Sequence, residues 1–338
     1  MGLRVWWLAV CILIGLVIPV VLLEGQVLAT LHQVSLGSIL MLLPLVFFCW
    51  WLNVERCFVL VSDHLVGLSR RRMMTFYLII ELFSKATPLG GGAPVAAVSL
   101  LRPLGVPAPV TLSLFVVMAL VDIAVVVTIL TAVFLFGVLA YLGVDPLLRD
   151  GITLLMIPLL ALSIALLWRH SRALLVLLLK ILKACRLRAV YRRRIARAVL
   201  RIRISVRNML ARSLAVWMRL LLLSLFYWVA MLSILYCSVR IAGADVSWPA
   251  TVAIQILSTG FGELLMLPGA AAGAEFGAAV MLTPLTGAVA AGVAIMIWRL
   301  MTFYLYLFAG FMASLSVAGG FRQIVREVEQ ARKDQGRL

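Results

Sequence analysis

The sequence has 338 residues, of which 64% are hydrophobic and 13% are charged, and its formal net charge is +17. A soluble globular domain carries about 25% charged residues. The composition therefore excludes that class and predicts an all-α polytopic membrane protein. An excess of basic residues is also found in nucleic-acid-binding proteins. In a chain this hydrophobic, cytoplasmic loops and anionic lipid headgroups explain it more directly, so we expect no nucleic-acid partner.

Six segments are long and apolar enough to cross a bilayer as helices, which takes about 20 residues. The first is longer than the apolar core of a signal peptide, so it is expected to remain as a span. The six predicted spans are Val5–Leu23, Leu36–Leu52, Pro109–Leu142, Ile152–Trp168, Leu214–Ile241 and Ala288–Val317. After the second span, Asn53–Ser69 is less apolar and is predicted to lie along the membrane surface.

Two further apolar segments, Glu81–Gly105 and Glu263–Gly287, are interrupted by prolines and glycines. Proline removes a backbone donor and glycine loosens the chain. Hydrocarbon tolerates such broken backbone only where it is buried in protein or lines a wet cavity. The stretches V-A-A-V-S-L-L-R-P-L-G and F-G-A-A-V-M-L-T-P-L-T-G align with one residue of slippage. Paired interruptions in two halves of a chain indicate the binding site of a transporter.

The distribution of Lys and Arg predicts how these segments sit in the membrane. Arg70–Arg72 and the basic segment 169–212 both belong on the cytoplasmic side. They are separated by two full spans, so 73–102 must enter and leave the membrane from the same side. The same count makes 248–284 enter from outside. We therefore predict two oppositely oriented re-entrant helical hairpins, at about 73–102 and 248–284, in an inverted-repeat-like arrangement.

This topology predicts an integral domain over residues 1–320 in the cytoplasmic (inner) membrane. Both termini, including the tail 321–338, are then cytoplasmic. Apolar residues recur at helical spacing between the charges of 169–212, which predicts amphipathic helices on the inner membrane surface. The arginines predicted to contact anionic lipid there are Arg192, Arg193, Arg194, Arg197 and Arg201.

Six ionisable residues fall at predicted membrane depth, where each costs on the order of 2.5–3.5 kcal/mol unless it is paired or hydrated. Glu81 and Lys85 are spaced to pair on one helical face, and Arg299 is a partner for Glu275 or Glu263. One interpretation is that these charges are structural ion pairs that lock the hairpins. The other is a cavity for a charged headgroup, with Lys85 and Arg299 facing phosphate and the carboxylates facing amines or protons. The two interpretations are not exclusive.

The cavity is predicted to form between the hairpins, from these charges and from the prolines and glycines of the turns. Its predicted residues are Glu81, Lys85, Pro88, Gly90, Gly91, Gly92, Arg102, Asp122, Glu263, Pro268, Gly269, Gly273, Glu275 and Arg299.

Motifs of catalysis are missing from the sequence. There is no H-E-x-x-H, no Walker lysine motif and no histidine placed for acid–base chemistry. Asp122 has no second aspartate at membrane depth, and the five cysteines lie in or beside apolar runs without metal-ligand spacing. We therefore predict that the protein is not an enzyme and uses no cofactor or metal.

Several short motifs carry a resemblance to a known family. They are P-L-G-G-G-A-P-V and L-L-R-P-L-G-V within Pro88–Val106, V-D at Val121–Asp122, L-P-G-A-A-A-G-A-E at Leu267–Glu275 and W-R-L at Trp298–Leu300. These motifs resemble the lysylphosphatidylglycerol synthase transmembrane (flippase-like) family. The family's proline-glycine-glycine…glutamate pattern and its following arginine fall on Pro268, Gly269, Glu275 and Arg299, with Ala270 in place of the second glycine. In the first half, Gly92-Ala93-Pro94 stands where many relatives have an acidic residue.

The resemblance implies translocation of a lipid between leaflets. In the bifunctional relatives a cytosolic aminoacyltransferase domain follows the membrane part, and because this chain ends at Leu338 we expect the membrane half without synthase activity. The leading hypothesis is a lipid flippase or transporter, with anionic phospholipid as its partner. The alternatives are a non-transporting partner or scaffold of a lipid-modifying enzyme, and an intramembrane enzyme that acts on headgroups. Small residues that face lipid are compatible with a homodimer.

Overall fold

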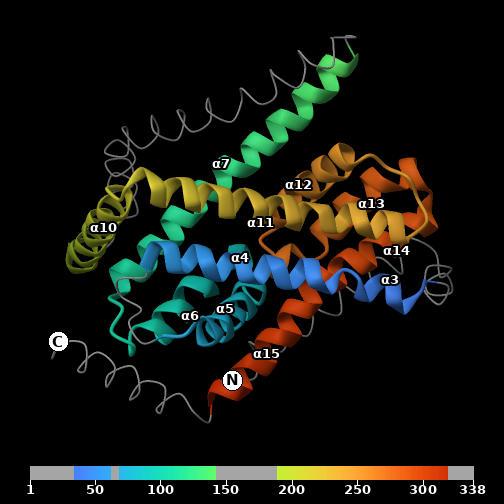
Figure 1. Cartoon of the computed structure of the whole chain (residues 1–338). Helices are drawn as coiled ribbons and strands as arrows, with labels where there is room; N and C mark the ends of the chain where they lie inside the picture. Colours follow the sequence, from blue (N-terminus) through green and yellow to red (C-terminus); the bar gives the residue numbers. More distant parts are fainter. Residues whose placement is uncertain (1–33, 62–67, 142–188, 319–338) are drawn as a thin grey trace.

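The computed structural model describes residues 34–61, 68–141 and 189–318 (Figure 1). Within these ranges every regular element is a helix. The predicted spans Val5–Leu23 and Ile152–Trp168, residues 169–188 of the basic segment and the tail 321–338 lie outside the described residues. The elements are α3 (Leu36–Leu40), α4 (Leu43–Val61), α5 (Arg70–Lys85), η2 (Pro88–Gly90), α6 (Gly92–Leu101), α7 (Ala108–Tyr141), α10 (Ala189–Leu210), α11 (Leu214–Ile241), α12 (Trp248–Leu264), η3 (Pro268–Ala270), α13 (Gly273–Thr286), α14 (Ala288–Arg299), η4 (Leu300–Tyr304) and α15 (Leu305–Ala318).

Four helical stretches of the described chain are long and apolar enough to cross a membrane. They are Leu36–Val61, Ala108–Gly137, Leu214–Ile241 and Ala288–Val317. They coincide with four of the six predicted spans, as expected for a polytopic membrane protein. The last is the most enclosed, because 61% of its apolar stretch is buried against 33–39% for the other three.

The second span is longer than the predicted Leu36–Leu52. α4 continues to Val61, and Asn53, Glu55 and Arg56 are all buried within it. The prediction that residues 53–61 lie along the membrane surface is therefore wrong. Polar residues can continue a membrane helix when they meet partners inside the protein, and each of these three residues does so.

The helices pack around a single large hydrophobic core. α4 and α11 run side by side, α14 lies against α11, and α15 lies against α5 (Figure 1). α6 contributes Leu101 to this core. Its residues Ala93, Ala96 and Ala97 form a second, small cluster with Ile80 of α5.

The first interrupted segment folds as a helix, a turn and a second helix, with α5 and α6 as its arms. Thr87 closes the turn, since its Oγ1 accepts a hydrogen bond from the N–H of Gly92 and donates one to the carbonyl of Phe83, both at 2.7 Å. Only glycine fits at position 92, because a Cβ there would lie 2.5 Å from the Phe83 oxygen.

The second interrupted segment has the same plan, with α12 and α13 as its arms. These arms also approach closely, so that a Cβ on Gly273 would lie 2.5 Å from the Cα of Gly262. The turn holds Met266, Ala270 and Ala272 at positive φ, at 53°, 56° and 66°. Such a conformation costs a residue other than glycine roughly 1–2 kcal/mol. The neighbouring helices must hold this turn in place.

The tips of the two helix–turn–helix units, η2 and η3, pack against each other in the middle of the bundle. From there α5 and α6 extend toward one end of the molecule, and α12 and α13 toward the other (Figure 1).

Candidate functional site

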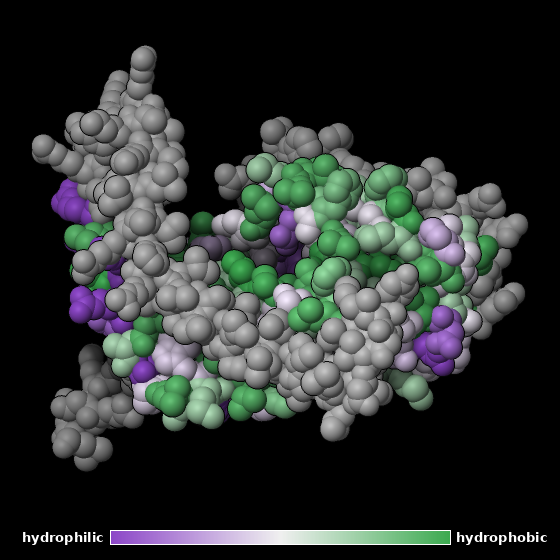
Figure 2. Space-filling model, turned by 90° about the horizontal axis from the view of Figure 1, so that it is seen from above, coloured by the Kyte–Doolittle hydropathy of each residue, from purple (hydrophilic) through white to green (hydrophobic). Residues whose placement is uncertain are grey.

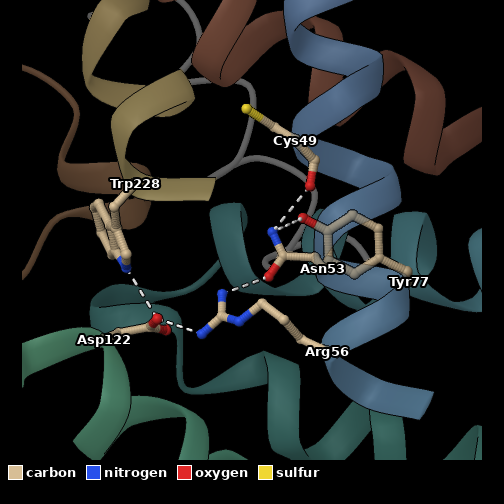
Figure 3. A network of polar contacts seen from close by, with 6 residues as sticks. All are labelled: Cys49, Asn53, Arg56, Tyr77, Asp122 and Trp228. Carbon is tan, nitrogen blue, oxygen red and sulfur yellow. Dashed lines mark hydrogen bonds and ion pairs between the residues drawn. The ribbon is translucent and has the colours of Figure 1, made fainter. Parts of the chain in front are cut away.

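Arg56 lies at the centre of a polar network inside the bundle (Figure 3). Its side chain is 1% exposed and forms an ion pair through Nη2 with Asp122 of α7. Nη1 donates to Oδ1 of Asn53 at 2.9 Å, and the Asn53 amide donates to the hydroxyl of Tyr77 at 3.2 Å. The indole of Trp228 donates to the same Asp122 oxygen at 2.9 Å. The network thus joins α4, α5, α7 and α11.

Asp122 is a partly exposed member of this network. Its side chain is 25% exposed, and both Arg56 and Trp228 contact the same oxygen, Oδ1. Its other oxygen, Oδ2, stands outside these contacts. On one face of the molecule, Figure 2 shows a hollow with hydrophilic surface among apolar side chains. A partly accessible carboxylate within an apolar span fits a hydrated interior.

Glu81 and Lys85 extend the polar interior toward the tip η2. The Glu81 side chain is half-buried. Its carboxylate lies close enough to Tyr77, Asp122 and Lys85 to interact with them electrostatically. The predicted Glu81–Lys85 ion pair does not form in the described structure. The Lys85 ammonium instead lies 5.5 Å from the ring centroid of Tyr306 on α15. Lys85 is the last residue of α5, so its side chain can turn from its own helix toward this ring.

Arg299 and Glu275 form a second buried charge pair, as one of the two predicted partnerships expects. The Nε–Oε1 distance is 2.9 Å and the Nη2–Oε2 distance is 3.0 Å. Nη1 and Nη2 also donate to the carbonyls of Gly269 at 3.4 Å and Ala270 at 3.2 Å. The guanidinium is therefore held by the Glu275 carboxylate and by two backbone carbonyls of the second helix–turn–helix unit. This geometry makes Arg299 a clamp on the tip η3 and gives no support to a phosphate-facing role.

The last span changes its helical register directly after Arg299. Leu300–Tyr304 form a π-turn, which takes up one residue more than an α-helical turn. In an uninterrupted α-helix, residues seven apart share nearly the same face. The π-turn therefore rotates Tyr306 away from the face of Arg299. Arg299 contacts the second unit, whereas Tyr306 contacts Lys85 and Trp50.

A comparison with protein families identifies the family to which this chain belongs. The family model described as the lysylphosphatidylglycerol synthase TM region matches residues 6–310. The chain belongs to this family. The match confirms the resemblance carried by the short motifs, and it spans both helix–turn–helix units and both charge clusters. The comparison with curated proteins finds no match.

In this family member, the predicted site residues fall into three groups. The polar interior contains Glu81, Lys85 and Asp122, and the clamp contains Glu275 and Arg299. The turns contain Pro88, Gly90, Gly91, Gly92, Pro268, Gly269 and Gly273. Two predicted residues lie away from these groups, because Arg102 is exposed at the end of α6 and Glu263 is exposed on α12. Among the described residues, no group of three or more His, Cys, Asp or Glu could hold a metal ion.

Sequence reasoning missed most partners of the polar interior. The missed residues are Asn53, Arg56, Tyr77 and Trp228. Glu55, which binds Arg70 and Arg219, was missed as well. One signal was available, since Asn53 and Arg56 are three apart and directly follow an apolar, aromatic run. At that spacing they share a helical face and can reach one partner.

Exposed arginines gather at one end of the bundle. There, buried Glu55 binds Arg70 at 2.5 Å and Arg219 at 3.3 Å, and these two side chains are 67% and 61% exposed. The turn between α11 and α12, at the opposite end, holds the surface pair Arg240–Asp245. Hydrophilic residues are visible at both ends in Figure 2.

α10 is the described part of the basic segment and lies against α7, where Ser205 and Ser113 are hydrogen bonded at 2.6 Å. Its exposed face alternates apolar and basic residues. They are Arg197, Leu200, Arg201, Ile204 and Arg207. Arg192, Arg193 and Arg194 belong to the first turns of the same helix. This pattern is typical of a helix that lies in a membrane interface.

Proposed function

We propose that this chain moves a phospholipid or a related polar lipid between the leaflets of the cytoplasmic membrane. In this proposal the two helix–turn–helix units are oppositely oriented re-entrant hairpins. The observation that carries it is the packing of their tips against each other, next to the end of α5 that carries Glu81 and Lys85, in a bundle of apolar helices. Asp122 lies close enough to act on the charge of Glu81. Charged groups at membrane depth are costly unless they serve a polar substrate or a hydrated path. The family supports the proposal, because it is the membrane region of a lipid synthase.

The ion pairs divide the interior charges into structural and available groups. Arg56 with Asp122, and Arg299 with Glu275, are neutral pairs. Lys85 and Glu81 are the remaining charges of the described interior, and both are half-buried. We assign the contact with the phosphate of a lipid headgroup to Lys85, and Glu81 balances the Lys85 charge one turn away on the same helix. The arginine-rich end then faces the cytoplasm, where anionic headgroups favour it.

Movement of fluorescent lipids in proteoliposomes tests this proposal. Lipids with anionic and zwitterionic headgroups are added to separate samples, and the fraction that reaches the opposite leaflet is followed over time. Lys85→Met should slow the movement about tenfold, since a lost charge-assisted hydrogen bond of about 1.5 kcal/mol corresponds to that factor. Arg240→Met, which removes a surface cation at the far end, should leave it unchanged. Wild-type protein that moves lipid no faster than empty liposomes contradicts the proposal.

The exposed arginines favour a second candidate function, a membrane partner that holds a lipid-modifying enzyme. Arg70, Arg219 and the exposed face of α10 would then contact an acidic surface of that enzyme. This candidate predicts a stable complex after mild solubilisation that is lost in Arg197→Glu/Arg201→Glu and retained in Lys85→Met. Lipid movement predicts the opposite sensitivity.

A further inference from the structure

Two buried side chains that contact each other, Tyr306 and Trp50, carry hydrogen-bond donors without an acceptor. The Tyr306 hydroxyl and the Trp50 indole N–H make no hydrogen bond to any described residue, although the two side chains are only 1% and 4% exposed. Their rings meet edge to face, with centroids 5.4 Å apart. Buried polar groups in native proteins are nearly always paired. Even if the indole N–H closed onto the phenol oxygen, the phenol proton would still need an acceptor.

Lys85 brings a positive charge to the same place. Its ammonium lies over the Tyr306 ring, and no described carboxylate comes within ion-pair distance of it. A Lys ammonium and a Trp indole are donors only. Three helices, α4, α5 and α15, therefore bring two donor-only groups and one hydroxyl together around the Tyr306 ring. The chemistry that this arrangement lacks is a negatively charged acceptor.

We propose that Lys85, Tyr306 and Trp50 form a binding site for a phosphate-ester anion. This site deepens the proposed function and rests on it for the source of the anion, a phospholipid headgroup. The ammonium supplies the charge, and the hydroxyl and indole donate to phosphate oxygens. Both of these polar atoms are covered in this conformation. The half-buried Lys85 marks the side from which the anion arrives.

Glu81 opposes this binding. It lies one turn before Lys85 on α5, and its negative charge acts on both Lys85 and the Tyr306 hydroxyl. It balances the ammonium when the site is empty, and an entering anion is repelled by it. Removal of this charge and removal of the Lys85 charge therefore change anion affinity in opposite directions. A purely structural role for the two residues predicts loss in both cases.

Thermal unfolding of the full chain in detergent measures binding without transport, because a ligand that binds the folded state raises the unfolding temperature. Three probes are compared: dihexanoyl phosphatidylglycerol, dihexanoylglycerol and inorganic phosphate. The phospholipid should stabilise the wild type and dihexanoylglycerol should not. Lys85→Met and Tyr306→Phe should each weaken the apparent affinity about tenfold, and Glu81→Gln should strengthen it several-fold. Trp50→Phe should weaken it, whereas Trp51→Phe and Tyr236→Phe are matched controls without effect.

Equal stabilisation by dihexanoylglycerol, or unchanged affinity in Lys85→Met and Tyr306→Phe, overturns the site. Stabilisation by inorganic phosphate that is lost in Lys85→Met supports the site and assigns free phosphate as the source. Binding of the phospholipid without lipid movement in liposomes keeps the site and removes the proposed function. Lipid movement with unaltered binding in the variants keeps the function and removes the site.

Discussion

Arg56 and Asp122 are unequal partners in their ion pair, since Arg56 is sealed in the core and Asp122 is a quarter exposed. Asp122→Leu leaves an uncompensated charge in the core, which costs about 3–5 kcal/mol. Arg56→Met leaves the Asp122 carboxylate with its hydrogen bond from Trp228 and with partial solvation. This substitution should therefore lower the free energy of unfolding by less than Asp122→Leu does. The double variant should be more stable than Asp122→Leu alone. Thermal unfolding of the four purified proteins measures this, and equal losses in both single variants contradict it.

Ala270 is held at φ 56° in the tip η3, directly after Gly269. Glycine adopts the left-handed conformation without strain, which stabilises the folded state by roughly 1–2 kcal/mol. The greater freedom of glycine in the unfolded chain lowers the free energy of unfolding by about 0.4–1 kcal/mol. Ala270→Gly should therefore raise the unfolding temperature slightly. Gly269→Ala is the contrasting variant and should be strongly destabilising, because its Cβ would collide with the ring of Phe303. A lower unfolding temperature for Ala270→Gly counts against this account of the turn.

At the scale of elements, close contact between α12 and α13 depends on Gly262. A Cβ there would lie 2.6 Å from the Ala270 carbonyl oxygen, whereas one on Gly260 would meet nothing within 4 Å. Gly262→Ala should push the two arms apart and lower the unfolding temperature. Gly260→Ala on the same helix should raise it, since alanine is favoured over glycine in a helix by up to about 1 kcal/mol. Similar effects of the two substitutions would show that the arms do not pack as described.

At the scale of the whole molecule, the distribution of arginines predicts its orientation. With the native cysteines replaced, Asp245→Cys should react with a membrane-impermeant maleimide added to intact cells. Ser69→Cys should react only after the membrane is opened. Ser69 is the N-cap of α5 and Asp245 lies in the turn between α11 and α12, and neither belongs to an interior cluster. Labelling of both from outside would exclude the proposed entry of the two units from opposite faces.

Much of the fold could be predicted because it depends on local patterns. Membrane spans follow from long apolar runs, and the helix–turn–helix units follow from prolines and glycines at their turns. The Arg299–Glu275 pair was predictable because few charges lie at membrane depth. The Arg56 network was not, since three polar residues within four positions resemble the end of a span. Their burial depends on Asp122, Tyr77 and Trp228, which lie on other helices.

The Glu81–Lys85 pair shows a second limit of sequence reasoning. A spacing of four residues places both side chains on one helical face. It carries no information about a ring on α15. The rotation that brings Tyr306 to Lys85 comes from the π-turn Leu300–Tyr304, which follows α14. Register shifts of this kind leave little trace in the pattern of apolar residues.

Three of the four buried residues of α6 pack in the small second cluster, which has a consequence for local unfolding. α6 is ten residues long, lies between glycines at positive φ (Gly90 and Gly105), and makes no side-chain hydrogen bond to another helix in the described structure. Its local unfolding should therefore cost less free energy than that of α12 or α13, and its amide protons should exchange with deuterium first. Arg299 clamps the other tip, so in the proposed lipid movement the opening free energy of α6 would set how often a headgroup passes.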